Sequence, residues 1–493
     1  MAWAFSIVSV ADAPLFDAIS AAALARIVEF GVRDLANMAL AVAKSRFVDD
    51  PLLHSIAERA RRTIAGASAV ADLANAAWAV AALALHNRPL MDAIAAKAMQ
   101  LMSDCSAHDL SKMAWSMAKC LVFDAPFLEA IAAEALIRIS NFAPRQLAST
   151  AWAFAGVPCS NEPLFHAIAS SAVKTISEFS QQALANTAWA YATMAFVDKP
   201  LFDAIAASAM RISDDFVAQG IANLAWSLAK VQFGDGPLME LMARGLQAHI
   251  ASGEFETQNL SNTAWSFSAM RIVNGPLLPA ISAAAVSKIQ ELSMQDLSNT
   301  AWAFAKSLID DRPLFDALAS ASVPSCAEFE SQTISNLAWS FARCAYLDVP
   351  LLQAMSEEAV RKLQDFRAQC LANTAWSLAS LLVRDAQFLE AMAAAAIFSI
   401  REFNPQNLSN MLWAFAKLQV ADVPLGDAIA SASVHTIDDF DGQNLSNTSW
   451  SLSALAWSDV PLLTAIASSA FRKMLSLSDQ DLTNTFWAFA SLQ

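Results

Sequence analysis

The chain of 493 residues is poor in the residues that build turns and β-strands. It holds only 11 glycines, 17 prolines and 2 tyrosines. A protein made of β-strands needs many more turn residues and β-formers than this. Alanine, leucine and methionine are frequent instead, and these residues favour helices. The composition therefore predicts an all-α protein.

Charge and long apolar runs are also scarce. Charged residues make up 16% of the chain and apolar residues 56%, which excludes a disordered protein. No uninterrupted apolar run reaches the ~18 residues that a spanning helix needs, so we expect no membrane segment. The net charge of −15 argues against non-specific binding to nucleic acid or to anionic lipid, and we expect no binding to DNA.

The six cysteines include no C-x-x-C pair, so the sequence predicts no zinc site, no redox motif and no cofactor. We expect free, buried or half-buried thiols, as is typical of a reducing, intracellular compartment. The first ten residues lack the basic region of a secretion signal. They also contain no arginine, and so do not resemble an arginine-rich transit peptide. No targeting peptide is therefore visible.

Tryptophan reveals an internal repeat, and such repeats decide the fold. Leu40 takes the place of one missing tryptophan, and the interval in this series is 37 residues except for 38 between Leu40 and Trp78 and 39 between Trp226 and Trp265. We number each repeat from this residue as position 0. The tryptophans of the series are Trp3, Trp78, Trp115, Trp152, Trp189, Trp226, Trp265, Trp302, Trp339, Trp376, Trp413, Trp450 and Trp487.

The residue pattern of each repeat predicts two helices, which we call helix A and helix B. Helix A begins at the proline of position +11, as in residues 200–212, and an Asp or Asn two residues earlier can cap it. A short turn around the phenylalanine of position −10 follows. Helix B then carries the tryptophan, as in residues 295–306. Both helices show apolar residues at three- and four-residue spacing.

A single helical hairpin cannot bury both of its faces, whereas a row of hairpins can. We therefore predict an α-solenoid (superhelix) of about thirteen 37-residue helix-turn-helix repeats. No linker or low-complexity segment interrupts the pattern, so we expect one continuous array over residues 1–493. Both ends fall within a repeat, which suggests a stretch of a longer protein.

The constant columns of the repeat are interpreted as its frame. We expect the tryptophans to pack between adjacent repeats rather than to stack on the bases of a bound nucleic acid. We expect the asparagine of position −3, as in Asn299, to hydrogen-bond the backbone of a neighbouring repeat. A repeat protein that recognises different nucleic-acid bases needs contact residues that differ between repeats, so constant positions cannot determine which base sequence is bound.

The recurring Gln-x-Leu-Ser/Ala-Asn-x-Ala-Trp-Ala/Ser-Phe-Ala-Lys, followed by Asp-x-Pro-Leu-Phe, resembles the octotricopeptide repeat. It is also similar to heptatricopeptide repeats and to the repeat proteins of organellar RNA-editing substrate-binding complexes. The resemblance covers essentially the whole chain. It implies a protein of mitochondria or chloroplasts that binds RNA and supports its processing, stability, editing or translation.

Two basic columns are candidate contacts to an RNA backbone. Both lie in the last turn of a helix, where a cation is favourable whatever the function, and we prefer that explanation. Position +4 of helix B supplies Lys44, Lys119, Lys230, Lys306, Arg343 and Lys417, and the end of helix A supplies Arg211 and Lys288.

Position −6, in the first turn of helix B, varies between repeats. Variable polar residues are candidates for reading bases, although a loosely constrained helix start explains the variation more simply. The candidates are Gln146, Asn259, Thr333 and Asn407.

The sequence does not indicate an enzyme or a metal site. No pair of the six histidines has the spacing of a zinc protease, and there is no nucleophile elbow, P-loop or dinucleotide fingerprint. The first hypothesis is an adaptor that binds single-stranded RNA in an organelle. The alternative is a scaffold that binds partner proteins and no nucleic acid, which the acidic net charge favours.

Overall fold

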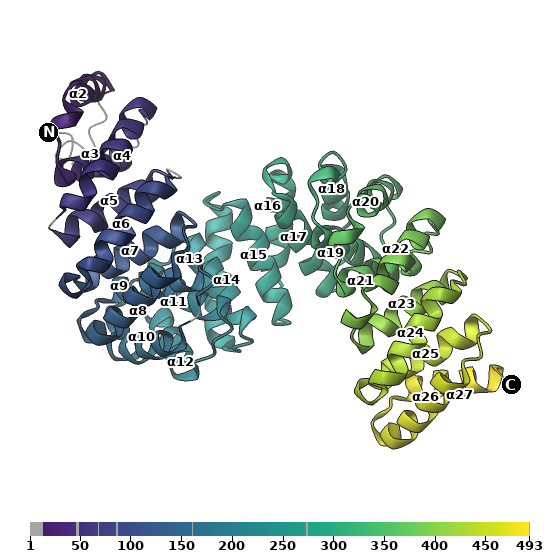
Figure 1. The fold of residues 1–493 in the computed structure, drawn as a ribbon. Coiled ribbons are helices and arrows are strands. Elements are labelled where there is room, and N and C mark those ends of the chain that lie inside the picture. The colour runs from purple at the N-terminus through teal and green to yellow at the C-terminus, as the bar shows by residue number, and fades with distance from the viewer. Residues whose placement is uncertain are drawn as a thin grey trace. The chain divides into compact units, whose positions relative to one another are not determined.

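The computed structural model describes residues 13–45, 49–67, 69–84, 87–159, 161–272 and 275–492. These residues form 26 α-helices and no strand (Figure 1). Helices that follow one another in sequence pack together, which confirms the predicted α-solenoid of about thirteen hairpins. The chain divides into two units, Met1–Gly245 and Leu246–Gln493. That all repeats form one continuous array stays a prediction.

Helix A starts at or just before the proline of position +11 in nearly every repeat. The A helices are α2 (Ala13–Arg26), α4 (Asp50–Thr63), α6 (Arg88–Gln100), α8 (Ala125–Arg138), α10 (Glu162–Thr175), α12 (Lys199–Arg211), α14 (Gly236–Ala251), α16 (Leu277–Ser287), α18 (Arg312–Ser322), α20 (Val349–Arg361), α22 (Ala386–Phe398), α24 (Val423–Thr436) and α26 (Val460–Lys473).

Helix B contains position 0. The B helices are α3 (Val32–Ser45), α5 (Val70–Ala82), α7 (Ala107–Lys119), α9 (Pro144–Ala155), α11 (Gln181–Thr193), α13 (Ala218–Lys230), α15 (Thr257–Ala269), α17 (Met294–Lys306), α19 (Ser331–Arg343), α21 (Ala368–Ser380), α23 (Pro405–Lys417), α25 (Gly442–Ala454) and α27 (Asp479–Ser491).

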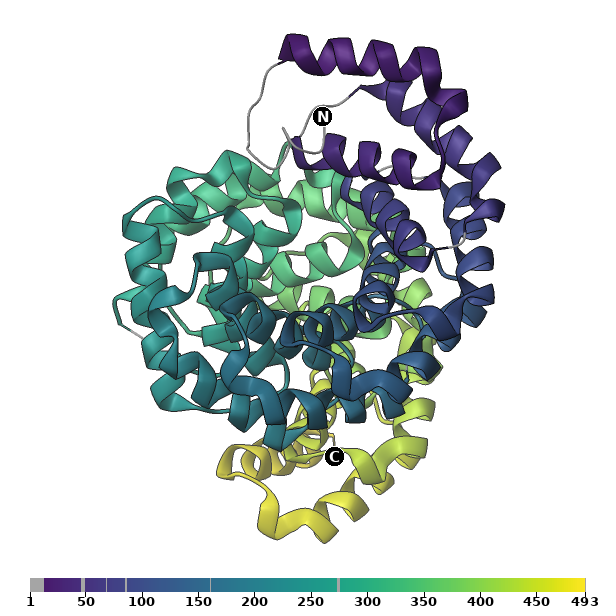
Figure 2. The same ribbon diagram turned by 90° about the vertical axis from the view of Figure 1, so that its left-hand side faces the viewer.

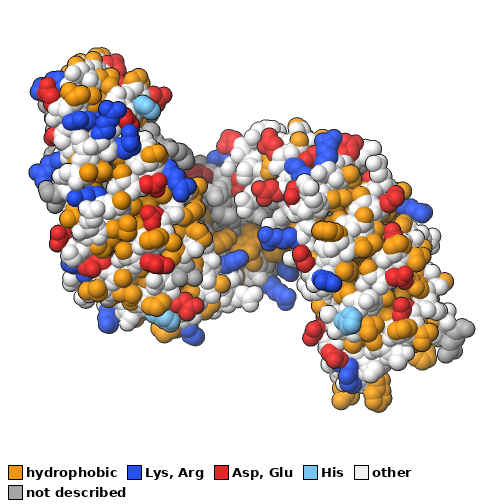
Figure 3. All heavy atoms as spheres, viewed as in Figure 1, with side chains coloured by type: hydrophobic (Ala, Val, Ile, Leu, Met, Phe, Trp, Pro, Cys, Tyr) orange, Lys and Arg blue, Asp and Glu red, His pale blue; other side chains and the backbone are white. Residues whose placement is uncertain are grey.

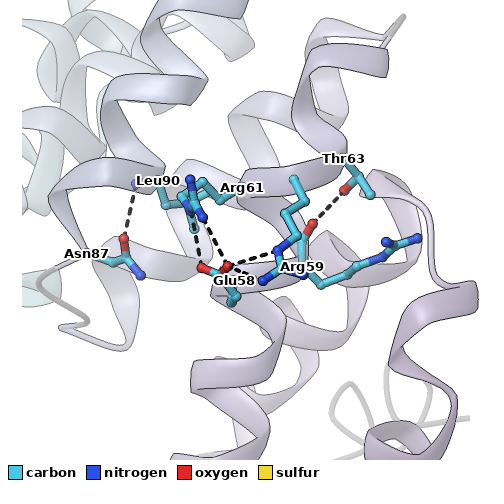
Figure 4. Close-up of polar contacts among 7 residues, drawn as sticks. Glu58, Arg59, Arg61, Thr63, Asn87 and Leu90 are labelled. Atoms are coloured by element: carbon cyan, nitrogen blue, oxygen red, sulfur yellow. Dashed lines mark hydrogen bonds and ion pairs between the residues drawn. The ribbon is translucent and has the colours of Figure 1, made fainter.

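A side-chain cap fixes the start of helix A. Asn87 Oδ1 accepts a hydrogen bond from the backbone N–H of Leu90 at 3.1 Å (Figure 4). Asp385 makes the same bond to Phe388 at 3.1 Å, although its repeat has Gln387 in place of the proline. The cap satisfies a backbone donor that the first turn leaves unpaired. The predicted role of the Asp and Asn column is confirmed.

In most repeats the turn from helix A to helix B is a short 3₁₀ segment followed by a buried residue; α14 and α15 are joined without a described 3₁₀ segment. Phe329 and Phe440, at position −10, are fully buried there. The 3₁₀ segments are Ile27–Glu29, Ile64–Gly66, Met102–Asp104, Ile139–Asn141, Ile176–Glu178, Ser213–Asp215, Ile289–Glu291, Cys326–Glu328, Leu363–Asp365, Ile400–Glu402, Ile437–Asp439 and Met474–Ser476.

Within each unit, neighbouring hairpins lie side by side (Figures 1 and 2). Successive B helices pack much more closely than successive A helices. Small residues on helix B permit this approach, since Ala301 and Ala303 are fully buried beside Leu297. A row of helices that is closer on one side must curve toward that side, so the B helices line the inner face of each unit.

The turn from helix B to the next helix A uses a left-handed residue at position +6. Ala345, for example, has φ of 50°, and the N–H of Tyr346 donates to the carbonyl oxygen of Phe341 at 2.8 Å. This is the six-to-one bond of a Schellman motif, here without glycine. It turns the residue at position +7 back onto helix A, where the Tyr346 and Phe315 ring centroids are 5.9 Å apart.

All six cysteines are free, as predicted. Burial raises the pKa of Cys105 to about 12 and that of Cys326 to about 11, so both thiols stay protonated at neutral pH. Among the described residues, no helix combines the length and apolar character required to span a membrane.

Candidate nucleic-acid interface

One face of helix B remains accessible in every described repeat from Trp78 onward. Residues at −7, −3, 0 and +4 share this face because an α-helix turns once every 3.6 residues. In α17 they are Gln295, Asn299, Trp302 and Lys306. The glutamine and lysine are exposed, and the asparagine and tryptophan are half-buried. We call this set of positions the tryptophan stripe.

The indole rings of neighbouring repeats contact one another. Ring centroids lie 6.0 Å apart for Trp152 and Trp189 and 6.4 Å apart for Trp376 and Trp413, with ring planes 29° and 27° apart. The predicted packing of tryptophans between repeats is confirmed. The rings are nevertheless only half-buried, so each keeps a surface that a ligand can reach.

The asparagines of position −3 behave differently from the prediction. The side chains of Asn186, Asn299 and Asn373 are half-buried and make no hydrogen bond within the described part of the chain. The expected ladder of bonds to a neighbouring backbone is therefore wrong for these residues. Asn75 does have a partner, since its Oδ1 accepts from Lys112 Nζ at 2.7 Å. The free amides face the same side as the indoles and can bind a ligand.

In unit Met1–Gly245 the stripe lines a groove of about 860 Å³. Three basic side chains stand in it where later repeats have amides, namely those of His108, Lys112 and Arg145. Burial, with a further contribution from Lys112, lowers the pKa of His108. The described residues that line the groove include no carboxylate. They are Trp78, His108, Ser111, Lys112, Trp115, Ala143, Arg145, Gln146, Ala148, Ser149, Trp152, Ser180, Gln182, Ala183 and Asn186.

The basic residues of position +4 stand at the C-terminal end of the stripe. Lys306 Nζ lies 5.9 Å from the centroid of the Trp302 ring, which links the cation to the stripe. The Lys44 side chain falls outside the described residues. The other predicted backbone contacts of this column are exposed and pair with no carboxylate in the described part of the structure: Lys119, Lys230, Lys306, Arg343 and Lys417.

The basic residues at the end of helix A join one repeat to the one before it. Arg211 Nη2 donates to the carbonyl oxygen of Ser177 at 2.9 Å, and Lys288 Nζ donates to that of Phe255 at 2.7 Å. Arg59 binds the carbonyl of Val28 in the same way. Because helices A and B are antiparallel, these cations lie at the edge of the repeat opposite to Lys230 and Lys306. The structure therefore does not bring the two predicted basic columns together.

Near Arg59 the charges are balanced locally. Glu58 accepts hydrogen bonds from Arg61 and Arg62, with the Glu58 and Arg61 side chains drawn in Figure 4. These bonds lower the pKa of Glu58 to about 2. The two arginines are therefore paired at neutral pH, unlike the cations of position +4.

Two of the candidates for base reading at position −6, Asn259 and Asn407, are buried, whereas Gln146 is half-buried and lines the groove. Gln146 Oε1 accepts from the backbone N–H of Ala143 at 2.8 Å, and Asn407 Oδ1 accepts from that of Asn404 at 3.3 Å. Asn259 and Asn407 are each 5% exposed, and Thr333 is half-buried. To meet a base, the two buried amides would have to leave these positions. Base reading at position −6 stays a prediction that this burial weakens.

Sequence reasoning missed the glutamine of position −7 as a candidate. It recurs from Gln182 to Gln480, one turn before the asparagine, and it is exposed in each of these repeats. Its spacing of seven residues from the tryptophan was the available signal, since seven residues are two helical turns. In the described part of the chain, no group of three or more His, Cys, Asp or Glu side chains could hold a metal ion.

Fold and stripe together define a helical-repeat protein with one accessible row of aromatic and amide side chains. The family model of the RNA-editing substrate-binding complex 6 protein matches the chain twice, over residues 1–250 and 236–493. The chain belongs to this family. This agrees with the resemblance to repeat proteins of RNA-editing substrate-binding complexes.

Two of the solved structures that match the chain have low sequence identity and low TM-scores. A homology model of the full-length AP-3 complex is 10% identical, with 96% of this chain and 87% of that chain covered and a TM-score of 0.35. A circular tandem repeat protein with a novel repeat topology is 13% identical, with 95% and 97% covered and a TM-score of 0.20. No curated protein sequence matches the chain.

Proposed function

We propose that the protein is an adaptor that binds single-stranded RNA along the tryptophan stripe and serves RNA editing. The observation that carries this proposal is the row of half-buried indoles, free amides and unpaired cations on one face of the B helices. Indoles stack on bases, amides pair with base edges, and cations bind phosphates. The family membership supports the link to RNA editing.

The groove around Trp115 offers the elements of such a site in the smallest space. Lys112 and Arg145 can neutralise phosphates, His108 can do so once it is protonated, and the neighbouring indoles can stack on bases. Further along the stripe, Lys230, Lys306, Arg343 and Lys417 supply phosphate contacts at its edge. We propose no backbone contact for Arg211 and Lys288, because each already binds a carbonyl of the preceding repeat.

The location follows from the family resemblance. Octotricopeptide-like repeats and RNA-editing substrate-binding complexes are features of organelles, so we propose a mitochondrion or chloroplast. The mechanism is binding and presentation of RNA, without catalysis by the protein. Partners would be the RNA and the other proteins of an editing complex.

The net charge of −15 favours a second candidate, a scaffold for proteins only. Acidic and basic side chains are interspersed on the face of each unit shown in Figure 3, without a continuous basic patch. A row of free amides can also bind the backbone of an extended peptide. Under this alternative the stripe is occupied by a protein segment.

Binding of a fluorescent pool of random single-stranded RNA separates the two functions. The RNA proposal predicts a dissociation constant in the micromolar range or below that rises steeply with salt. Replacing Trp302 and Trp339 by alanine should weaken binding, with thermal unfolding as the control for folding. Absence of binding at low salt would leave the protein scaffold as the function.

A further inference from the structure

The accessible face of unit Leu246–Gln493 is chemically uniform. Every repeat from Trp265 to Trp487 has glutamine at −7 and asparagine at −3. All of these glutamines are exposed, and all of these asparagines are half-buried. None of the amides has a hydrogen-bond partner in the described part of this unit. A ligand that follows the stripe therefore meets the same three side chains at each step.

The variable column at position −6 is turned away from this face, whereas the variable position +4 lies at its edge. At position −6, Asn444 Oδ1 accepts from Ser409 Oγ at 2.9 Å and Asp481 Oδ1 accepts from Ser446 Oγ at 2.9 Å. These side chains join neighbouring B helices. The variation of position −6 therefore serves contacts within the protein, whereas the constant residues face the ligand.

A protein that reads a mixed sequence one base per repeat varies the two or three side chains that touch each base. This unit keeps all three constant. Resting on the proposed RNA function, we propose that unit Leu246–Gln493 selects a uniform tract, and that the tract is a run of adenines. Each repeat would hold one base, with its indole against the ring and its two amides at the base edge.

The pairing chemistry of the amides identifies the base. A carboxamide places a donor beside an acceptor, and this matches the N6 amino group and N7 of adenine. Guanine offers two acceptors on the same edge and is read best by Arg or Lys. In this unit cations occur at position +4 only in Lys306, Arg343 and Lys417, at one edge of the stripe. Adenine, as a purine, also covers more of the indole than a pyrimidine does.

Unit Met1–Gly245 provides an internal contrast. In its Trp115 and Trp152 repeats, position −7 is His108 and Arg145, and position −3 is Lys112 and Ser149. These two repeats lack the pair of amides, whereas the repeats of Trp189 and Trp226 have it. We expect the Trp115 and Trp152 part of the stripe to hold phosphates without selecting a base.

Binding of labelled oligoadenylate, oligouridylate, oligocytidylate and a mixed sequence of equal length to the full chain tests the proposal. We expect oligoadenylate to bind about ten-fold more tightly than each of the others. Equal affinities, or tighter binding of another sequence, would overturn the adenine assignment and leave RNA binding intact. If no RNA binds at low salt, the proposed function itself fails.

A triple variant links the selectivity to the amides. Asn299→Ser, Asn336→Ser and Asn373→Ser introduce the residue that the chain already has as Ser149. The preference for oligoadenylate should disappear, while the salt dependence and the thermal unfolding stay unchanged. The matched control is Lys306→Gln, which should weaken all sequences by the same factor. A preference that survives the triple variant would overturn the role of the amides.

Discussion

Gly426 lies directly beneath the ring of Trp457, and a Cβ atom at residue 426 would be 1.5 Å from two carbons of that ring. The two positions are the same pair that brings Phe315 against Tyr346, with centroids 5.9 Å apart, in another repeat. At residue 426 the absence of a side chain on helix A leaves room for the indole of Trp457.

The pair predicts a change of sign in a mutant cycle. Gly426→Ala should lower the free energy of unfolding by about 1–3 kcal/mol, because the added methyl group overlaps the indole. In the background of Trp457→Val, the same change should raise it by about 1 kcal/mol, because alanine is the better helix former. Valine stands at this position as Val383 and Val420. Denaturant unfolding of the four proteins measures both effects, and equal effects in both backgrounds would contradict the pairing.

The two basic columns should respond differently to neutralisation. Changing Lys230, Lys306 and Arg343 to Gln removes three phosphate contacts, and each contact contributes about 0.7 to the slope of log K against log salt for single strands. The slope should therefore decrease by about 2 without loss of stability. RNA titrations over a range of salt concentrations measure it.

The matched control for that variant is Lys288→Gln together with Lys362→Gln. Each lysine donates to a carbonyl of the preceding repeat, with Lys362 Nζ 2.9 Å from the oxygen of Phe329. The control should lower the unfolding temperature and leave the salt slope unchanged. A reduced slope in the control would place the RNA on the other edge of the repeats.

Two adjacent residues of α23 should have different roles, one in the stability of the fold and the other in RNA binding. Asn407→Ala removes an acceptor that is 5% exposed and should reduce stability by about 1 kcal/mol. Gln406→Ala removes an exposed amide and should reduce affinity for RNA while stability stays the same. Thermal unfolding and RNA binding of both variants check this. If Asn407→Ala changed selectivity for bases at unchanged stability, base reading would belong to position −6.

Affinity should also depend on pH through His108. Its pKa is lowered by burial and by Lys112, so the imidazole is neutral at pH 7.5. A phosphate nearby favours the protonated form, so binding takes up a proton and affinity rises as the pH falls toward 5.5. His108→Gln, which introduces the residue of the later repeats, should remove the His108 part of this dependence. RNA titrations at several pH values compare the two proteins.

The helices and their caps were predictable because the signals are local. Asp or Asn at +9 and proline at +11 define the start of helix A by themselves, and even Gln387 does not move it, because Asp385 still caps the helix. The turn after helix A was equally clear from phenylalanines such as Phe440. The spacing of three residues places Asn299 on the same face as Trp302, and the spacing of seven residues would have placed Gln295 there as well.

The direction of that face could not be predicted. Asn299 and Asn407 are both asparagines of helix B, yet one is free and half-buried and the other is buried and bonded. The two residues differ in position: Asn299 is at −3 on the accessible face, and Asn407 is at −6, where its Oδ1 accepts from the backbone N–H of Asn404. Lys230 and Lys306 end helix B, whereas Lys288 follows helix A and binds a carbonyl of the preceding repeat, a contact that exists only once the repeats are packed.

Photocrosslinking of single-stranded RNA followed by identification of the attached residues tests the central claim most directly. The account predicts crosslinks on helix B at positions −7, −3 and 0, for example at Gln295, Asn299 and Trp302. Crosslinks confined to the A helices, or to the edge at Arg211 and Lys288, would contradict it.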